Sequence, residues 1–205
     1  MTDEPLRRLF VGTFLSDSQK AHLGEIRRSN DRLVADWQRK LRWVRPVKLH
    51  LTWLFLGEVK GTLVPEVESR LASMLSEQPG GRIIYDQAEF WPSPGKARQL
   101  VLTASVIPDP VANLGKTIRA GLSELAAKPD ARDFRPHITL LRFGDSTAPA
   151  QTQSPRQRLK FPDWLDLRQF LPITQEIQSV VLLESHLGAG GEDYETLMTC
   201  ALQLP

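Results

Sequence analysis

The sequence is poor in cysteine and in charge of one sign. Its 205 residues include one cysteine, Cys200, so the chain forms no intramolecular disulfide and offers no Cys-based zinc site or iron–sulfur cluster. The 26 Lys and Arg are nearly balanced by 24 Asp and Glu, and the formal net charge is +2. This balance excludes a histone-like, tail-driven nucleic-acid binder, so a polyanionic partner would have to bind at a local basic patch.

Long apolar runs are also missing. Runs such as residues 51–56 have the length of a strand and fall far short of a membrane span. The N-terminus, Met-Thr-Asp-Glu-Pro, is polar and acidic, unlike the start of a signal peptide. We therefore expect a cytoplasmic protein that does not contact a membrane.

What is present predicts a mixture of strands and helices. Hydrophobic periodicity and turn residues predict helices over residues 17–37, 62–76 and 109–127, and strands over 9–15, 50–56, 82–91, 99–106, 137–142, 176–187 and 194–202. A Gly-rich turn at 188–191 predicts a hairpin between the last two strands. Because the elements do not alternate strictly as βαβ, the pattern favours an α+β fold.

Histidine is scarce, yet two of the four histidines lie in matching contexts. The chain reads RPVKLHLTWLF at residues 45–55 and RPHITLLR at residues 135–142. On a strand, residues i and i+2 point to the same face, so His50 lies beside Thr52 and His137 beside Thr139. Two such strands facing each other across a cleft would present two imidazoles and two hydroxyls to one ligand.

These residue types suit acid–base chemistry on a phosphate. One imidazole can be neutral while the other is protonated near neutral pH, which provides a general base and a general acid. Thr hydroxyls donate to phosphate oxygens, and the Arg142 guanidinium matches a phosphate. Arg142 and Phe55 each follow a histidine by five residues, so they reach the cleft only if their strands are irregular. Neither His50 nor His137 has partners at metal-ligand spacing, so we expect no metal.

The two motifs and their flanks resemble the 2H phosphoesterase superfamily, and within it the RNA 2′,3′-cyclic phosphodiesterases, also called the 2′-5′ RNA ligase family. The resemblance is carried by the stretches WVRP at 43–46, HLTWLFLGEV at 50–59, FWPSP at 90–94 and FRPHITLLR at 134–142. It implies one bilobal α+β domain over residues 1–205, in which two antiparallel sheets form a central cleft and helices cover the outside.

The resemblance also implies an activity and roles. The activity is hydrolysis of an RNA terminal 2′,3′-cyclic phosphate to a 2′-phosphate, without metal or cofactor, by a protein expected to be a monomer. The partners implied are RNA ends or nucleotides that carry the cyclic phosphate. By the same resemblance, His137 is the base that activates water and His50 protonates the departing 3′-oxygen, although the sequence does not settle this order. Thr52, Thr139 and Arg142 would hold the phosphate and Phe55 would lie near the nucleotide.

Some features depart from the family pattern, and alternatives stay open. Trp53 is bulkier than usual for its position, but strand alternation points it away from the cleft. The segment at 144–158 is rich in Ser, Thr, Ala, Pro and Gln, which predicts a mobile insertion longer than is typical of the family. The loop at 188–193 is also longer than is typical. The alternatives at this point are 2′-5′ RNA ligation, which is the reverse reaction, and an RNA-end binding module whose hydrolysis is incidental. A cyclic phosphodiester other than an RNA end is a further possibility.

Overall fold

The computed structural model describes residues 4–35, 41–93, 97–128, 133–143, 167–188 and 191–203. The insertion predicted at 144–158 and the middle of the predicted hairpin turn, residues 189–190, lie outside these ranges. The strands are β1 (Leu6–Phe14), β2 (Leu41–Trp43), β3 (His50–Lys60), β4 (Gly81–Tyr85), β5 (Gln87–Trp91), β6 (Gln99–Thr103), β7 (His137–Phe143), β8 (Ile173–Ile177), β9 (Ser179–Gly188) and β10 (Gly191–Ala201). The helices are α1 (Asp17–Ala35), α2 (Val64–Leu75) and α3 (Asp109–Leu122), with 3₁₀ turns at Pro46–Lys48, Gly61–Leu63, Ser123–Leu125 and Arg168–Phe170.

The large sheet consists of two antiparallel arms. Its strand order is β10-β9-β1-β3-β7-β6-β5, with β2 beside β7, and β4 pairs with β8 in a separate small sheet. Within the described residues, the pairing of β3 with β7 is confined to Leu51 and Ile138. One arm therefore runs from β10 to β3 and the other from β7 to β5, and a single residue pair joins them. The α+β class and the antiparallel sheets predicted from the sequence are confirmed.

That joining pair sets up a local twofold relation between the two sequence motifs. Leu51 directly follows His50, and Ile138 directly follows His137, so equivalent positions of the two motifs are paired. In an antiparallel pair, neighbours on either side of such a position lie crosswise. The register therefore brings His50 toward Thr139 and Thr52 toward His137.

Two predicted strands are each divided in the structure, and a third extends beyond its predicted end. The predicted strand at 82–91 is two strands in different sheets, because the chain turns at Asp86, whose carboxylate accepts a hydrogen bond from the Ser105 backbone N–H (2.8 Å). The predicted strand at 176–187 is likewise divided between β8 and β9. The strand predicted over 50–56 continues to Lys60. Within it, Gly57 adopts a φ of 76° that a residue with a side chain rarely adopts.

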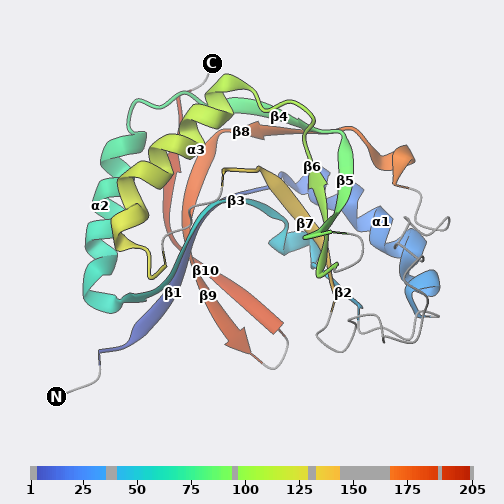
Figure 1. The fold of residues 1–205 in the computed structure, drawn as a ribbon, viewed down its shortest axis with the longest axis horizontal. Helices are drawn as coiled ribbons and strands as arrows, with labels where there is room; N and C mark the ends of the chain where they lie inside the picture. Colours follow the sequence, from blue (N-terminus) through green and yellow to red (C-terminus); the bar gives the residue numbers. More distant parts are fainter. Residues whose placement is uncertain are drawn as a thin grey trace.

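The helices lie outside the sheets and close one core. Figure 1 shows α2 and α3 side by side over one end of the molecule and α1 at the other end. Most buried apolar residues of these helices and of both arms of the sheet belong to one hydrophobic cluster, which includes Ile26, Leu71, Ile118, Leu51 and Ile138. Phe10, Val181 and Leu183 form a second, smaller cluster. No helix in the described part of the chain is long and apolar enough to cross a membrane.

Candidate active site

An irregularity in β3 turns Phe55 toward the cleft. Pairing with β1 jumps from Val11–Leu54 to Gly12–Thr52, which leaves Trp53 unmatched. Trp53 and Leu54 are consequently both buried, and Phe55 emerges on the side of His50 and Thr52. Trp53 faces the interior, as expected from alternation, and its indole N–H donates to the Thr13 hydroxyl (2.9 Å).

The same irregularity occurs at the equivalent place in β7. Pairing with β6 jumps from Leu100–Leu141 to Val101–Thr139, which leaves Leu140 unmatched. Leu140 and Leu141 are both buried, and Arg142 emerges beside His137 and Thr139. In a regular strand, a residue five positions after a histidine would point to the opposite face. The unmatched residue three positions after each histidine shifts the alternation, so Phe55 and Arg142 point to the same face as the histidines.

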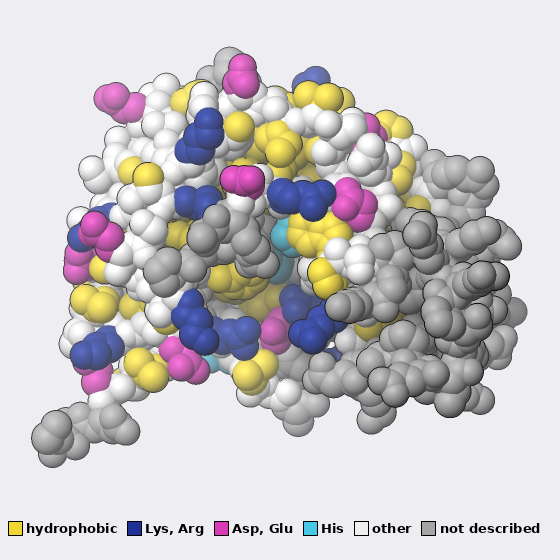
Figure 2. Space-filling model, in the orientation of Figure 1, with side chains coloured by type: hydrophobic (Ala, Val, Ile, Leu, Met, Phe, Trp, Pro, Cys, Tyr) yellow, Lys and Arg dark blue, Asp and Glu magenta, His cyan; other side chains and the backbone are white. Residues whose placement is uncertain are grey.

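The two motifs line two adjoining pockets in crosswise fashion. What we call the His50 pocket contains His50 from the first motif together with Thr139 and Arg142 from the second. Its other walls are Arg42, Trp43, Val44, Arg45, Lys48, Leu187, Gly188, Glu192 and Tyr194. Because Arg42, Arg45, Lys48 and Arg142 line it, the His50 pocket is suited to anions. Figure 2 shows Lys and Arg side chains around a hollow in this face of the molecule, with a histidine side chain inside the hollow.

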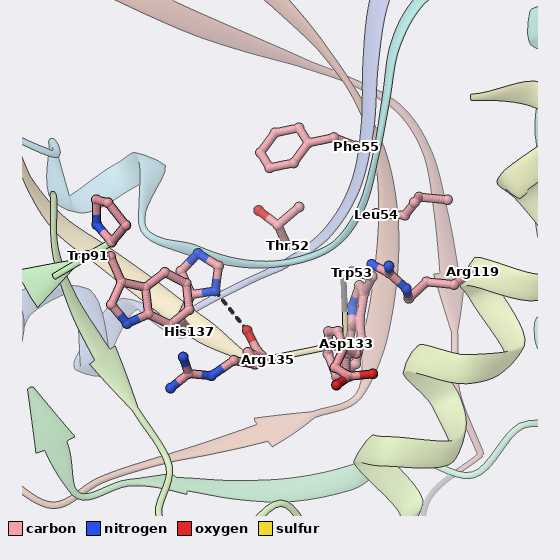
Figure 3. Close-up of a pocket in the computed structure, with 11 residues that line it drawn as sticks. Thr52, Trp53, Leu54, Phe55, Trp91, Arg119, Asp133, Arg135 and His137 are labelled. Carbon is pink, nitrogen blue, oxygen red and sulfur yellow. Dashed lines mark hydrogen bonds between the residues drawn. The ribbon is translucent and has the colours of Figure 1, made fainter. Parts of the chain in front are cut away.

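The second, the His137 pocket, contains His137 from the second motif together with Thr52 and Phe55 from the first. Its other walls are Trp53, Leu54, Trp91, Pro92, Arg119, Asp133, Phe134 and Arg135. Figure 3 shows Thr52 and Phe55 projecting from β3 on one side and His137 with Trp91 on the other. The structure thus brings all six predicted site residues to these two pockets, and aromatic side chains dominate the second.

His50 is held in one orientation and is largely enclosed. Its Nδ1 donates to the Lys48 carbonyl oxygen (2.6 Å), because a carbonyl only accepts, so Nε2 of the neutral ring carries the lone pair. The ring lies 5.1 Å from that of Phe10 and 5.3 Å from that of Tyr194. Gly12 on β1 packs closely against this strand, since a Cβ there would lie 3.0 Å from the Leu51 carbonyl oxygen.

Enclosure lowers the pKa of His50. Burial is the main cause, the positive charges of Arg142 and His137 add to it, and together they outweigh the Lys48 carbonyl and Glu192, so that the pKa falls to about 4. At neutral pH His50 is therefore neutral, with Nε2 able to accept a proton. The pairing of Leu51 with Ile138 sets the two histidine motifs side by side, as a shared phosphate requires.

The residue two positions before His50 is a cation with its own partners. Nζ of Lys48 lies 2.9 Å from a carboxylate oxygen of Asp193 on β10 and 5.4 Å from the centre of the Tyr194 ring. Lys48 lowers the pKa of Asp193 by hydrogen bonding and by its charge. The β9–β10 hairpin is thereby tied to the chain that orients His50.

The surroundings of His137 repeat this arrangement. Its Nδ1 donates to the carbonyl oxygen of Arg135 (2.8 Å), again two residues earlier, as the dashed line in Figure 3 marks. The Arg135 guanidinium lies 4.8 Å from the centre of the Trp91 ring and 3.3 Å from Glu89. The Trp91 ring in turn lies 4.4 Å from that of His137. Each histidine therefore has a backbone acceptor, a cation, a carboxylate and an aromatic ring in equivalent places.

Glu89 on β5 joins several of these groups. Its carboxylate accepts hydrogen bonds from the Trp91 indole N–H (2.8 Å) and the Thr103 hydroxyl (2.8 Å), in addition to Arg135. Burial opposes its ionisation, but these hydrogen bonds and the charge of Arg135 outweigh burial and lower the pKa of Glu89. Glu89 is thus an ionised anchor for the ring that lies against His137.

Neither of the two anchoring carboxylates was predicted from the sequence. Glu89 and Asp193 are distant in sequence from the motifs that they support, and neither has a local pattern. A usable signal did exist, since both histidines follow a cation by two residues, Lys48 in one motif and Arg135 in the other. A buried or stacked cation implies a carboxylate partner, although not which one.

Among the residues that the structure describes, one group of potential metal ligands lies outside the two pockets. Carboxylate oxygens of Glu184 and Glu195 and a ring nitrogen of His186 lie within 4.8 Å of one another on the β9–β10 hairpin. Glu184 already pairs with the Arg7 guanidinium, and that positive charge opposes binding of a cation. We interpret the group as an ion-pair cluster.

Comparisons with known proteins identify the family of the chain. A family model described as LigT like Phosphoesterase matches residues 15–101 and 102–163. A curated Aquifex aeolicus protein named RNA 2′,3′-cyclic phosphodiesterase is 26% identical over 137 residues, which cover 66% of this chain and 70% of that protein. A protein of the same name from Archaeoglobus fulgidus is 29% identical over 135 residues, covering 66% of this chain and 72% of the relative.

Solved structures share the fold over nearly the whole chain. E. coli LigT in its apo form is 27% identical, with a TM-score of 0.66 over 98% of this chain and 99% of LigT. A Thermus thermophilus protein is 23% identical, with a TM-score of 0.71 over 95% of this chain and 97% of that protein. The fold and the paired histidine motifs define a 2H phosphoesterase. More narrowly, the chain belongs to the LigT-like phosphoesterase family.

Proposed function

We propose that the protein hydrolyses the 2′,3′-cyclic phosphate at an RNA end to a 2′-phosphate without a metal ion. The observation that carries the proposal is the equivalent placing of His50 and His137, each held through Nδ1 by a backbone carbonyl and each beside a threonine of the other motif. The names of the two curated relatives supply the substrate class.

In this proposal the phosphorus lies where the two pockets meet. One imidazole accepts a proton from water, whose oxygen forms a bond to phosphorus while the bond from phosphorus to the 3′-oxygen breaks. The other imidazole donates a proton to that departing oxygen. Thr52, Thr139 and Arg142 donate to the phosphate oxygens, on which negative charge develops in the transition state.

The low pKa of His50 constrains which histidine has which role. In the unliganded protein His50 is neutral at pH 7, which is the form of a base. The order expected from the family resemblance, with His137 as base and His50 as acid, therefore requires bound phosphate to raise the pKa of His50, since a nearby anion favours the protonated ring. The pH dependence of kcat/KM for single histidine variants assigns the two roles.

The different walls of the two pockets indicate how the RNA end would lie. Phe55 and Trp91 offer faces for a nucleobase in the His137 pocket, where stacking needs no particular base. Arg42 and Arg45 line the His50 pocket and would attract the backbone phosphate of a neighbouring nucleotide. We therefore propose that the terminal base occupies the His137 pocket and that the chain continues past the His50 pocket.

The test is an incubation of a nucleoside 2′,3′-cyclic phosphate with the protein in EDTA, followed by separation of the products. We expect turnover to the nucleoside 2′-phosphate, and loss of turnover in His50→Ala and in His137→Ala with unchanged circular dichroism. Glu195→Gln, a change on an exposed side chain of β10, serves as the control. Dependence on an added metal ion, a 3′-phosphate product or no turnover at all would contradict the proposal.

A further inference from the structure

A carboxylate lies among the groups that would hold the phosphate. Glu192 lines the His50 pocket, with an oxygen 3.6 Å from the Arg142 guanidinium and 3.2 Å from the Tyr194 hydroxyl, which donates to it. The charge of Glu192 acts on the groups around it. It partly opposes the lowering of the pKa of His50, and it contributes to the raised pKa of Tyr194. An anion at this place opposes the binding of any phosphate.

Glu192 differs from its neighbour Asp193, whose place has a structural explanation. Asp193 pairs with Lys48 and so ties the hairpin to the strand that carries His50. The contact of Glu192 with Arg142, by contrast, uses the cation on which the phosphate would bind. Binding of the phosphate must therefore weaken this contact or bring two anions onto one guanidinium.

The charges of substrate and product make such a residue useful. A cyclic phosphodiester carries one negative charge, whereas a phosphomonoester has a second pKa of about 6 and carries close to two above neutral pH. The Coulomb energy between the phosphate and a nearby carboxylate is proportional to that charge. Glu192 therefore disfavours the product twice as strongly, on a free-energy scale, as it disfavours the substrate.

We propose that Glu192 is a charge-selecting residue that admits the monoanionic cyclic phosphate and rejects dianionic phosphomonoesters. This role rests on the proposed function. It speeds release of the 2′-phosphate product and keeps ordinary phosphomonoester ends from occupying the site. The selectivity comes from repulsion by one carboxylate in the binding pocket, and the donors on Thr52, Thr139 and Arg142 would serve both ligands.

The test compares Glu192→Gln with Glu195→Gln. Both variants lose one negative charge from β10, so they share any effect of net charge, and the amide oxygen introduced by Glu192→Gln still accepts from the Tyr194 hydroxyl. Glu195 lies 3.2 Å from His186 and lines neither pocket. The measurements are KM and kcat for a nucleoside 2′,3′-cyclic phosphate and the inhibition constant of the corresponding nucleoside 2′-phosphate, at pH 8 and pH 5.

At pH 8 we expect Glu192→Gln to lower KM by about threefold and the inhibition constant of the 2′-phosphate by about tenfold, the square of the first factor, as Coulomb interactions with one and two charges at about 6 Å in water require. At pH 5, where the monoester carries about one charge, the two factors should become equal. Glu195→Gln should match the wild type in both constants.

Three results would overturn the proposal: equal factors for substrate and product at pH 8, no change in either constant, or the same change in Glu195→Gln. Isothermal titration calorimetry with the two ligands gives the same comparison without turnover. A protein that does not hydrolyse the cyclic phosphate but shows the expected binding factors would contradict the proposed function and leave charge selection standing. Turnover of the cyclic phosphate together with equal effects of Glu192→Gln on substrate and product binding would support the proposed function and contradict charge selection by Glu192.

Discussion

His50 and His137 make equivalent contacts with their neighbours, but the cations beside them differ in solvent exposure. Both rings donate through Nδ1 to a carbonyl two residues earlier, and both lie against an aromatic ring that also contacts a cation. The Lys48 side chain is 10% exposed, whereas that of Arg135 is 60% exposed. The comparison teaches that the local motif orients the imidazole, while the neighbouring strands set how readily it takes up a proton.

The difference follows from the position of each motif in the sheet. β3 lies between β1 and β7, and the rings of Phe10 from β1 and Tyr194 from β10 enclose His50. β7 carries His137 in the other arm, where Trp91 from β5 is the contacting ring. A buried ring titrates at low pH because its charged form is poorly solvated. Four predictions test how far the two halves are equivalent.

The largest expected effect is loss of either imidazole. If the two rings act as an acid–base pair, His50→Ala and His137→Ala should each lower kcat by about 10²–10⁴-fold, the usual contribution of proton transfer by one side chain. The double variant should lose little more than the worse single variant, because the two act in one step. Single-turnover rates with a cyclic phosphate measure this. A variant that keeps more than a tenth of the wild-type rate would remove its histidine from the pair.

The second prediction concerns pH and separates the two halves. The folded-state pKa of His50, about 4, lies below its unfolded value of about 6.5, so between these pH values the unfolded chain binds a proton that the folded protein does not. Above pH 6.5 the titration of His50 therefore leaves the free energy of unfolding unchanged. As the pH falls from 6.5 toward 4, it lowers the free energy of unfolding. The loss amounts to about 3 kcal/mol.

The check uses urea unfolding at pH 7.5 and pH 4.5 for the wild type, His50→Gln and His137→Gln. Other groups titrate in this range, so the quantity of interest is the difference between each variant and the wild type. His50→Gln should narrow the gap in unfolding free energy between the two pH values. His137→Gln controls for the loss of an imidazole as such, and a gap for His50→Gln as wide as that of the wild type would contradict the low pKa of His50.

Much of the fold and of the candidate site could be predicted from the sequence, because each histidine motif is a short stretch of consecutive residues. The His-x-Thr spacing, most of the strands and the α+β class were predicted, and the family resemblance pointed to six residues that all line one of the two pockets. The skipped residues Trp53 and Leu140 were not predicted, since a bulge depends on pairing with β1 and β6 and leaves no clear pattern of its own. Long-range partners such as Glu89 and Asp193 were missed for the same reason.

The third prediction compares those two carboxylates. Glu89→Gln places an amide N–H₂ among the donors of Trp91, Thr103 and Arg135, so one of them loses its acceptor. We expect about a tenfold lower kcat, consistent with loss of one partly buried hydrogen bond, and little change in KM. Asp193→Asn should lower kcat by about twofold, because the Asp193 carboxylate is largely exposed and water weakens its ion pair with Lys48.

Salt distinguishes a positioning role from a general loss of structure. The effect of Asp193→Asn should shrink in high salt, which screens exposed charges, whereas that of Glu89→Gln should persist. Equal effects of the two substitutions, or a Glu89→Gln variant whose pH profile and kcat match those of the wild type, would show that Trp91 and Arg135 do not depend on Glu89 for their places beside His137.

The smallest expected effect concerns the aromatic wall of the His137 pocket. Phe55 is 52% exposed although it is a large apolar side chain, as a residue that stacks on a ligand base would be. Phe55→Ala should raise KM for a nucleoside 2′,3′-cyclic phosphate about fivefold with kcat unchanged, at the weaker end of base stacking because one face of the ring stays in water. Leu187, the exposed apolar residue of the His50 pocket, provides the contrast, and Leu187→Ala should raise KM less. A larger effect at Leu187 than at Phe55 would place the base in the His50 pocket and reverse the proposed direction of the RNA chain.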